Sequence, residues 1–321
     1  MKIALTGSIA YDYLMSFPGH FAEHILKDKL ESISLSFLVD KMVKRRGGIG
    51  PNIGYTMALL GGDPVLMSTV GQDFEGYRNW LEEKGVDTSG VKVIPDEFTA
   101  SFFATTDQDN CQISSFYPGA MSHAAEVTLS SWSGEPLDMV VISPTDPDAM
   151  NFYVIEAGKL KIPYVYDPSQ QIVRLSGDDL RRGVDGAYAL FVNEYEFYLI
   201  EKHAGLSIDE IKDLVEILVI TKGEQGSVIY SKDQEYEIPA VTPEKIIDPT
   251  GVGDAFRGGF LTGLSFDLDL KLCGEMGSLA AAYCLETDGP QNHSYTPELY
   301  ILRFRENFDD QSKLDILIKD Q

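Results

Sequence analysis

The sequence predicts an α/β fold in which a central, mostly parallel sheet is covered by helices on both faces and carries a small β lid. Short, continuously apolar runs alternate with helical patterns along most of the chain, and this is the pattern of strands buried on both faces. A length of 321 residues suits one main domain, 1–321, with a small appendage. Two segments that break the alternation are expected to form that appendage.

Six apolar runs rich in Val, Ile, Leu or Tyr are the expected strands of the central sheet. In chain order they are Lys2 to Thr6, Val65 to Val70, Met139 to Ser143, Tyr164 to Asp167, Ala189 to Asn193 and Leu218 to Thr221. A helix is expected to begin near Pro51, a long helical stretch to run from Val252 to about Glu286, and a last helix to span Pro297 to Asn307.

The segments at approximately 13–46 and 97–118 do not fit the alternation of strand and helix, and we expect them to be inserted as the lid. Within the second segment, Thr99 to Thr106 and Cys111 to Tyr117 alternate apolar and polar residues on either side of a polar turn. This alternation is typical of a β-hairpin. Both segments lie near the N-terminal half of the sheet, so they are expected to cover one of its edges.

The formal net charge of −24 repels phosphate backbones and anionic surfaces, so neither nucleic acid nor a membrane is an expected partner. No run approaches the roughly 18 apolar residues of a membrane span, and Asp12 acidifies the first apolar stretch, as in a buried strand rather than a leader. Cys111, Cys273 and Cys284 form no C-x-x-C pair, which is typical of scattered thiols in a reducing cytosol. We therefore expect a cytoplasmic protein that holds any anionic ligand by local donors.

The strongest local signal is the turn Gly251-Val252-Gly253, which leads into a helix. The backbone N–H groups of such a turn point at one spot, and the helix dipole adds partial positive charge there, so the turn can form an anion hole. Asp254 lies in the first helical turn, where a carboxylate beside a bound anion is unfavourable unless it accepts a proton. An ordinary turn followed by a helix cap would also explain these residues.

The sequence lacks G-x-x-x-x-G-K-[ST], and no G-x-G-x-x-G follows the first strand, so it is neither a P-loop protein nor a dinucleotide-binding fold. Asp248 to Phe260 instead resembles the C-terminal signature of the ribokinase (PfkB) family of carbohydrate and nucleoside kinases. Residues 47–52, Gly-Gly-Ile-Gly-Pro-Asn, resemble the N-terminal di-glycine element of that family. Intermediate motifs occur in the same order: Gly7-Ser8 with Asp12, Asn193 to Glu196, and Thr221 to Gly223 with Gly226.

Shorter blocks at 50–52, 116–121, 167–171 and 250–257 look most like the bacterial adenosine kinase branch of the family. The resemblance implies a ribokinase-like fold and transfer of the γ-phosphoryl group of ATP to the 5′-hydroxyl of adenosine, as in purine salvage. Asp254 would accept the proton of that hydroxyl, while the N–H groups of Gly251, Val252 and Gly253 stabilise the developing charge. Another nucleoside or a sugar as acceptor, or a catalytically silent ligand-binding relative, are the alternatives.

The resemblance also implies the residues that bind the acceptor. Asp12 is expected to accept hydrogen bonds from the ribose 2′ and 3′ hydroxyls, and Asn52 to hold the same sugar where Gly48 allows close approach. A turn residue at Asp12 and a helix-start residue at Asn52 are the alternatives. The further contacts expected in this pocket are Ser8, Ser36, Gln170 and Gln171.

Phe102 and Phe116 fall on the two arms of the predicted hairpin, where their rings are expected to stack on a purine whose polar edge meets the two glutamines. Packing of both phenylalanines against the core would explain them equally well.

Glu196, beside Asn193, is expected to organise Mg²⁺ and the ATP phosphates, partly through water, because Mg²⁺ keeps much of its hydration. A solvated acid in the first turn of a helix is the alternative. The resemblance implies that the nucleotide is bordered by Thr221, Gly223 and Gly226, that Arg257 reaches its phosphates, and that K⁺ or another monovalent cation binds near Asp248 and Thr250. Because exposed strand edges favour pairing, a homodimer through the lid is also expected.

Overall fold

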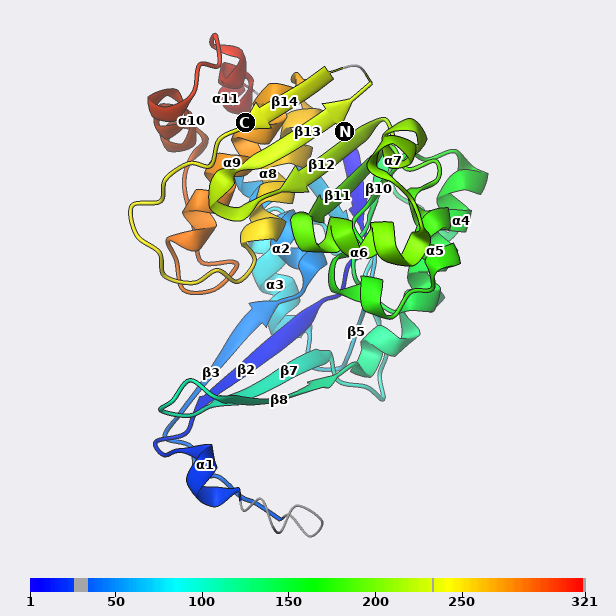
Figure 1. Cartoon of the computed structure of the whole chain (residues 1–321). Helices are drawn as coiled ribbons and strands as arrows, with labels where there is room; N and C mark the ends of the chain where they lie inside the picture. The colour runs from blue at the N-terminus through cyan, green and yellow to red at the C-terminus, as the bar shows by residue number, and fades with distance from the viewer. Residues whose placement is uncertain (26–33, 233, 320–321) are drawn as a thin grey trace.

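The computed structural model describes residues 1–25, 34–232 and 234–319. Its centre is an eight-stranded sheet in the order β14-β13-β12-β11-β10-β9-β1-β4, in which β12 to β4 are parallel and β13 and β14 run antiparallel at one edge (Figure 1). The strands are β1 (Lys2–Leu5), β4 (Asp63–Leu66), β9 (Met139–Ile142), β10 (Tyr164–Tyr166), β11 (Ala189–Asn193), β12 (Ile217–Thr221), β13 (Ser227–Ser231) and β14 (Gln234–Ile238). The predicted α/β fold with a mostly parallel sheet is confirmed.

Helices cover both faces of this sheet. One face packs against α4 (Pro147–Leu160), α5 (Gly177–Val184), α6 (Glu194–Ala204) and α7 (Ile208–Leu214). The other packs against α2 (Ile49–Leu59), α3 (Glu75–Glu83), α8 (Val252–Ser265) and α9 (Leu270–Leu285). In β9, Val140 and Ile142 enter the first core and Val141 enters the second, which explains the unbroken apolar runs.

Two further helices, α10 (Pro297–Asn307) and α11 (Ile316–Lys319), pack outside α9. Short 3₁₀ turns occupy Gly119–Glu126, Leu129–Ser131, Ser169–Val173, Gly223–Gln225 and Lys313–Asp315. Among the described residues, no helix is both long and apolar enough to cross a membrane.

A second sheet of four strands extends away from the body, in the order β3-β2-β7-β8 (Figure 1). Its strands are β2 (Ala10–Ser16), β3 (Lys41–Gly47), β7 (Ala100–Thr106) and β8 (Gln112–Tyr117), and α1 (Phe21–His24) lies at its far end. The predicted hairpin is confirmed as β7 and β8, and parallel pairing of β2 with β7 joins the two inserted segments. Residues 26–33, which belong to the expected lid segment 13–46, lie outside the described residues.

One expectation about a strand is wrong. The run Val65 to Val70 is not one strand: β4 ends at Leu66, and β5 (Thr69–Val70) pairs with β6 (Lys92–Val93) in a separate two-stranded sheet. An apolar run shows that a segment is buried but not where the chain leaves a sheet. The predicted helical stretch from Val252 is confirmed and consists of two helices, since Asp267 adopts a left-handed φ of 58° and Asp269 caps α9.

The chain returns from the small sheet to the body through Gly47 and Gly48. Gly48 has a φ of 96°, and a Cβ atom there would lie 2.4 Å from the carbonyl oxygen of Ser8. The hydroxyl of Tyr77, on α3, donates to the carbonyl oxygen of Gly47 at 3.0 Å. Position 48 requires glycine because its φ is left-handed and because a Cβ atom would clash with Ser8. The di-glycine element therefore allows the small sheet to lie close to the end of β1.

Candidate active site

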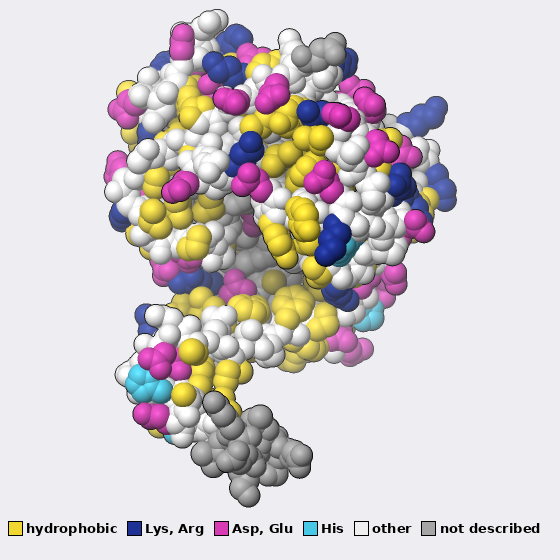
Figure 2. All heavy atoms as spheres, viewed as in Figure 1, with side chains coloured by type: hydrophobic (Ala, Val, Ile, Leu, Met, Phe, Trp, Pro, Cys, Tyr) yellow, Lys and Arg dark blue, Asp and Glu magenta, His cyan; other side chains and the backbone are white. Residues whose placement is uncertain are grey.

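A cavity of ≈ 550 Å³ opens between the small sheet and the carboxyl edge of the large sheet. Figure 2 shows the molecule hollowed between these two parts. All the acceptor-binding residues that the sequence predicted, except Ser36, line it: Ser8, Asp12, Gly48, Asn52, Phe102, Phe116, Gln170 and Gln171. Ser36 is exposed in the segment before β3 and is not among the lining residues.

The topology explains why the remaining predicted residues converge on the same edge. The carboxyl ends of parallel strands lie together, and ligands bind in the crevice outside them. Asn193 and Thr221 are register partners at the ends of β11 and β12. Gly223 and Gly226 follow in the turn after β12, with φ values of 57° and 88° that favour glycine.

The start of α8 faces this cavity. Gly251 has a φ of 78°, and a Cβ atom on it would lie 2.3 Å from Cβ of Pro290. A side chain is therefore excluded, and the helix begins in close contact with the residues around it. The N–H group of Val252 makes a long contact of 3.4 Å with the carbonyl oxygen of Pro249, whereas that of Gly253 has no partner among the described residues and is available to an anion.

Asp254 lies in the first turn of this helix and lines the cavity. Its Oδ2 accepts a hydrogen bond from Nδ2 of Asn52 at 2.8 Å. Burial raises the pKa of Asp254 to about 7, and the negative charges of Asp167 and Glu196 act in the same direction against Arg257 and Asn52. A carboxyl group with this pKa can accept a proton near neutral pH, which is the property required of a general base.

A chain of buried amides holds Asn52 in place, and the sequence did not predict it. Nε2 of Gln291 donates to Oδ1 of Asn52 at 2.8 Å and to the hydroxyl of Tyr77. Because the Asn52 oxygen accepts from Gln291, its amide nitrogen is turned toward Asp254. The hydrogen bonds continue through Tyr77 to the carbonyl oxygen of Gly47. They therefore link the carboxylate of Asp254 to the end of β3 in the small sheet.

Arg257 lies one turn further along α8 and is paired with Asp167 at the end of β10. Its Nη2 donates to Oδ1 of Asp167 at 2.6 Å, and the hydroxyl of Ser143 donates to Oδ2 at 3.0 Å. Asp167 is fully buried. A Cβ atom on Gly253 would lie 2.8 Å from Nη1 of Arg257, so this second amino group borders the anion hole.

Asn193 and Glu196 form a capping box at the start of α6. Oδ1 of Asn193 accepts from the Glu196 N–H, and Oε2 of Glu196 accepts from the Asn193 N–H, both at 2.8 Å. The hydroxyl of Ser169 donates to Oε1 of Glu196 at 3.3 Å. The local role of these two residues is therefore to cap the helix, which leaves one oxygen of Glu196 with only a long contact.

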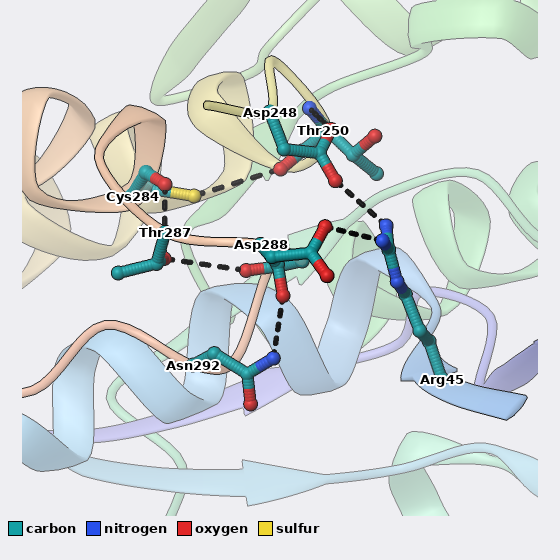
Figure 3. A network of polar contacts seen from close by, with 8 residues as sticks. Arg45, Asp248, Thr250, Cys284, Thr287, Asp288 and Asn292 are labelled. Atoms are coloured by element: carbon teal, nitrogen blue, oxygen red, sulfur yellow. Dashed lines mark hydrogen bonds and ion pairs between the residues drawn. The ribbon is translucent and has the colours of Figure 1, made fainter. Parts of the chain in front are cut away.

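Asp248 and Thr250, where the resemblance implies a monovalent cation, belong to a closed network (Figure 3). Oδ1 of Asp248 accepts from the Thr250 N–H at 2.9 Å, and Oδ2 accepts from Nη1 of Arg45 at 2.7 Å. Burial opposes these contacts, yet together they hold the pKa of Asp248 below its ordinary value. Each oxygen accepts one hydrogen bond, and the positive charge of Arg45 beside Asp248 would repel a second cation, so these residues do not fit K⁺.

A family description fits this arrangement over most of the chain: residues 19–297 match the pfkB family of carbohydrate kinases. The chain belongs to this family. It is 30% identical over 308 residues to a nucleoside kinase of Methanocaldococcus jannaschii, which covers 95% of this chain and 97% of that one. The predicted ribokinase-like fold and the predicted class of ATP-dependent phosphotransferase are confirmed.

Solved structures agree. A nucleoside kinase of Burkholderia thailandensis in complex with inosine is 36% identical, with a TM-score of 0.85 over 96% of this chain and 99% of that one. The adenosine kinase of Sinorhizobium meliloti has a TM-score of 0.72 over 96% of this chain and 99% of that one at 19% identity, which is a likeness of fold alone. The chain is thus similar to nucleoside kinases.

The role of Asp254 as proton acceptor can be tested by replacing it. Asp254→Asn should lower turnover by about 10²–10⁴-fold, the usual contribution of a general base. In the wild type, kcat/KM should fall about tenfold per pH unit below pH 7, since the pKa of Asp254 is about 7. Initial rates between pH 5 and pH 9 test both statements.

Thermal melts show whether the Asp254→Asn variant is folded. The pKa of Asp254 is raised above its unfolded value, so this group contributes stability that is lost as the pH rises from about 4 to about 7, and the wild type should lose stability relative to the variant over this range. Near-normal turnover in a folded variant would contradict the role of Asp254.

Gln291→Leu tests the amide chain. The Asn52 amide then loses the partner that turns its nitrogen toward Asp254. The hydrogen bond from Asn52 lowers the pKa of Asp254, so this pKa should rise in the variant. The loss of kcat/KM should be several-fold larger at pH 7 than at pH 9. Asn292→Leu, at the exposed neighbouring position, is the matched control and should leave the pH profile unchanged. An equal loss at every pH would show that Gln291 acts on stability alone.

Proposed function

We propose that the chain transfers the γ-phosphoryl group of ATP to the 5′-hydroxyl of a purine nucleoside, with adenosine as the leading acceptor. The observation that carries the proposal is the arrangement of one cavity, which has Asp254 at the anion-hole helix and two aromatic rings on the small sheet. Phe102 and Phe116 are register partners on β7 and β8, so they project side by side from the same face of the small sheet, and both line the cavity. A pair of rings matches a planar base and has no partner in a small sugar.

The rest of the cavity supports a ribose between the base and Asp254. Asp12, on β2, is a half-buried carboxylate whose pKa burial raises, and it offers the two acceptor oxygens that a vicinal diol requires. Asn52 lies at the start of α2 and donates a hydrogen bond to Asp254. It would therefore lie between the ribose and the carboxylate that accepts the proton. The hydroxyl proton passes to Asp254 while the Gly251 turn receives the phosphate charge.

Inosine is the second candidate acceptor, and a specific observation favours it. Arg174 lines the cavity beside Gln170 and Gln171, and it was absent from the sequence predictions. A guanidinium group only donates, which suits the 6-oxo group of inosine, whereas a glutamine amide serves either inosine or the 6-amino group of adenosine. The complex of the B. thailandensis nucleoside kinase with inosine is consistent with this wider choice.

The two phenylalanines should set the preference for nucleosides. Phe102→Ala and Phe116→Ala should each raise the KM for adenosine about 5- to 100-fold, because stacking of a base on an aromatic ring is worth about 1–3 kcal/mol. Phe103→Ala is the matched control, since Phe103 lies next in β7 and stacks on Tyr13 instead. ADP release with adenosine, inosine, guanosine, cytidine, ribose and fructose 6-phosphate measures the preference. A wild type that prefers a free sugar would overturn the proposal.

We also propose that Glu196 orders Mg²⁺ through water, since a single carboxylate suffices for an ion that keeps its hydration and shields the phosphates when bound. Its weakly engaged Oε1 supports this assignment. Glu196→Gln should raise the Mg²⁺ concentration needed for half-maximal rate several-fold, and excess Mg²⁺ should restore part of the rate. A loss that Mg²⁺ does not relieve would argue for a purely capping role.

A homodimer through the small sheet is the remaining proposal. Met42, Phe103 and Ile113 on this sheet are large hydrophobic side chains with 37–62% exposure, and β3 and β8 are its edge strands. Exposed apolar side chains beside open strand edges favour pairing. Light scattering should give about twice the monomer mass of 35.5 kDa. A monomeric mass at micromolar concentration would contradict the dimer.

A further inference from the structure

Arg45 connects the small sheet to two loops of the body (Figure 3). It lies on β3, and its Nη1 donates to Oδ2 of Asp248 at 2.7 Å while its Nη2 pairs with Oδ1 of Asp288. Asp248 precedes the anion-hole helix α8, and Asp288 follows α9. The side chain of Arg45 is 19% exposed and that of Asp248 is 13% exposed, so solvent screens this pair only partly.

A third carboxylate belongs to the same charge cluster. Asp12, which lines the cavity, is the register partner of Arg45 across β2 and β3. The charge of Arg45 favours the ionised form of Asp12, and the charge of Asp248 disfavours it. Three carboxylates therefore surround one guanidinium, and without a positive charge at this place they would repel one another.

The local backbone is shaped around the arginine. Gly289 has a φ of 101°, and a Cβ atom there would lie 3.4 Å from Cδ of Arg45. The thiol of Cys284 contacts the carbonyl oxygen of Thr250 at 3.6 Å, and the hydroxyl of Thr287 reaches the carbonyl oxygen of Cys284 at 3.1 Å. Side chains of the protein thus contact Asp248 and Thr250, the two residues near which a monovalent cation was expected.

We propose that the guanidinium group of Arg45 supplies the positive charge that a bound monovalent cation would otherwise supply beside the anion-hole loop, so that this kinase does not require K⁺. Arg45 is a positioning residue: it touches neither the reacting hydroxyl nor the phosphate, and it acts by holding Asp248 and Asp288 together. Because it is anchored in β3, the same contact ties the small sheet to the loop that begins α8. The inference rests on the proposed kinase activity.

The wild type provides the first test. Its rate of ADP release should differ by less than about twofold between KCl, NaCl and choline chloride at equal ionic strength, as expected when the compensating charge is part of the chain. A strong stimulation by KCl over choline chloride, tenfold or more, would overturn the proposal, because it would show that a cation is still needed. Failure to release ADP with any nucleoside in any salt would instead count against the proposed function.

Arg45→Met provides the second test, since it keeps the length of the side chain and removes its charge. The variant should lose about tenfold or more in kcat in choline chloride, as expected when one partner of a partly buried charge pair is removed. KCl or methylguanidinium should restore part of that loss. Arg46→Met is the matched control, because Arg46 is the next residue on β3 and its guanidinium stacks on Trp80.

Melting temperatures give a readout that does not depend on the acceptor. KCl should stabilise Arg45→Met more than choline chloride does, whereas the wild type and Arg46→Met should respond equally to both salts. Arg45→Lys, which keeps a charge but cannot bridge two carboxylates, should fall between the wild type and Arg45→Met. If Arg45→Met and Arg46→Met behave alike in rate, salt response and melting, the proposal is wrong.

Discussion

A carboxylate beside an anion-binding helix start is the constraint on which the rest of this structure depends. Asp254 must stay close to the N–H groups after Gly251, although it would repel a phosphate whenever it is ionised. Burial reduces this repulsion because it raises the pKa of Asp254 to about 7, while Asn52 and Arg257 limit the rise in pKa. The result is a group that can change its charge at neutral pH without leaving its place, which is what proton transfer from a hydroxyl requires.

The two sheets divide the binding surfaces, and three polar links hold the groups around these surfaces. The large sheet offers its carboxyl edge and the start of α8, whereas the small sheet offers the aromatic pair and Asp12. Two of these links run from the small sheet to the body, where Tyr77 donates to the carbonyl oxygen of Gly47 and Arg45 donates to Asp248, and the third, from Asn52 to Asp254, lies within the body. A movement of the small sheet therefore acts directly on the position and charge of the groups around Asp254.

Sequence reasoning succeeded where a function needs a local pattern. The strands were visible because both faces are buried, and the signature around Gly251 was visible because a positive φ and a close contact exclude other residues. It failed for partners that only the fold brings together. Arg45 and Asp248 are 203 residues apart in the sequence, and Gln291 and Asn52 are 239 residues apart. No sequence motif predicts either contact. The break after Leu66 also escaped prediction, because both sides of it are equally apolar.

The central claim is that the acceptor lies with its base on the small sheet and its 5′-hydroxyl at Asp254. A crystal structure with adenosine and a non-hydrolysable ATP analogue tests it most directly. The purine should stack on the ring of Phe102 or Phe116, with the ribose diol at Asp12 and the 5′-oxygen within about 3 Å of an Asp254 carboxylate oxygen, the reach of a general base. A nucleoside bound in the reverse direction, or with its 5′-oxygen away from Asp254, would contradict the account.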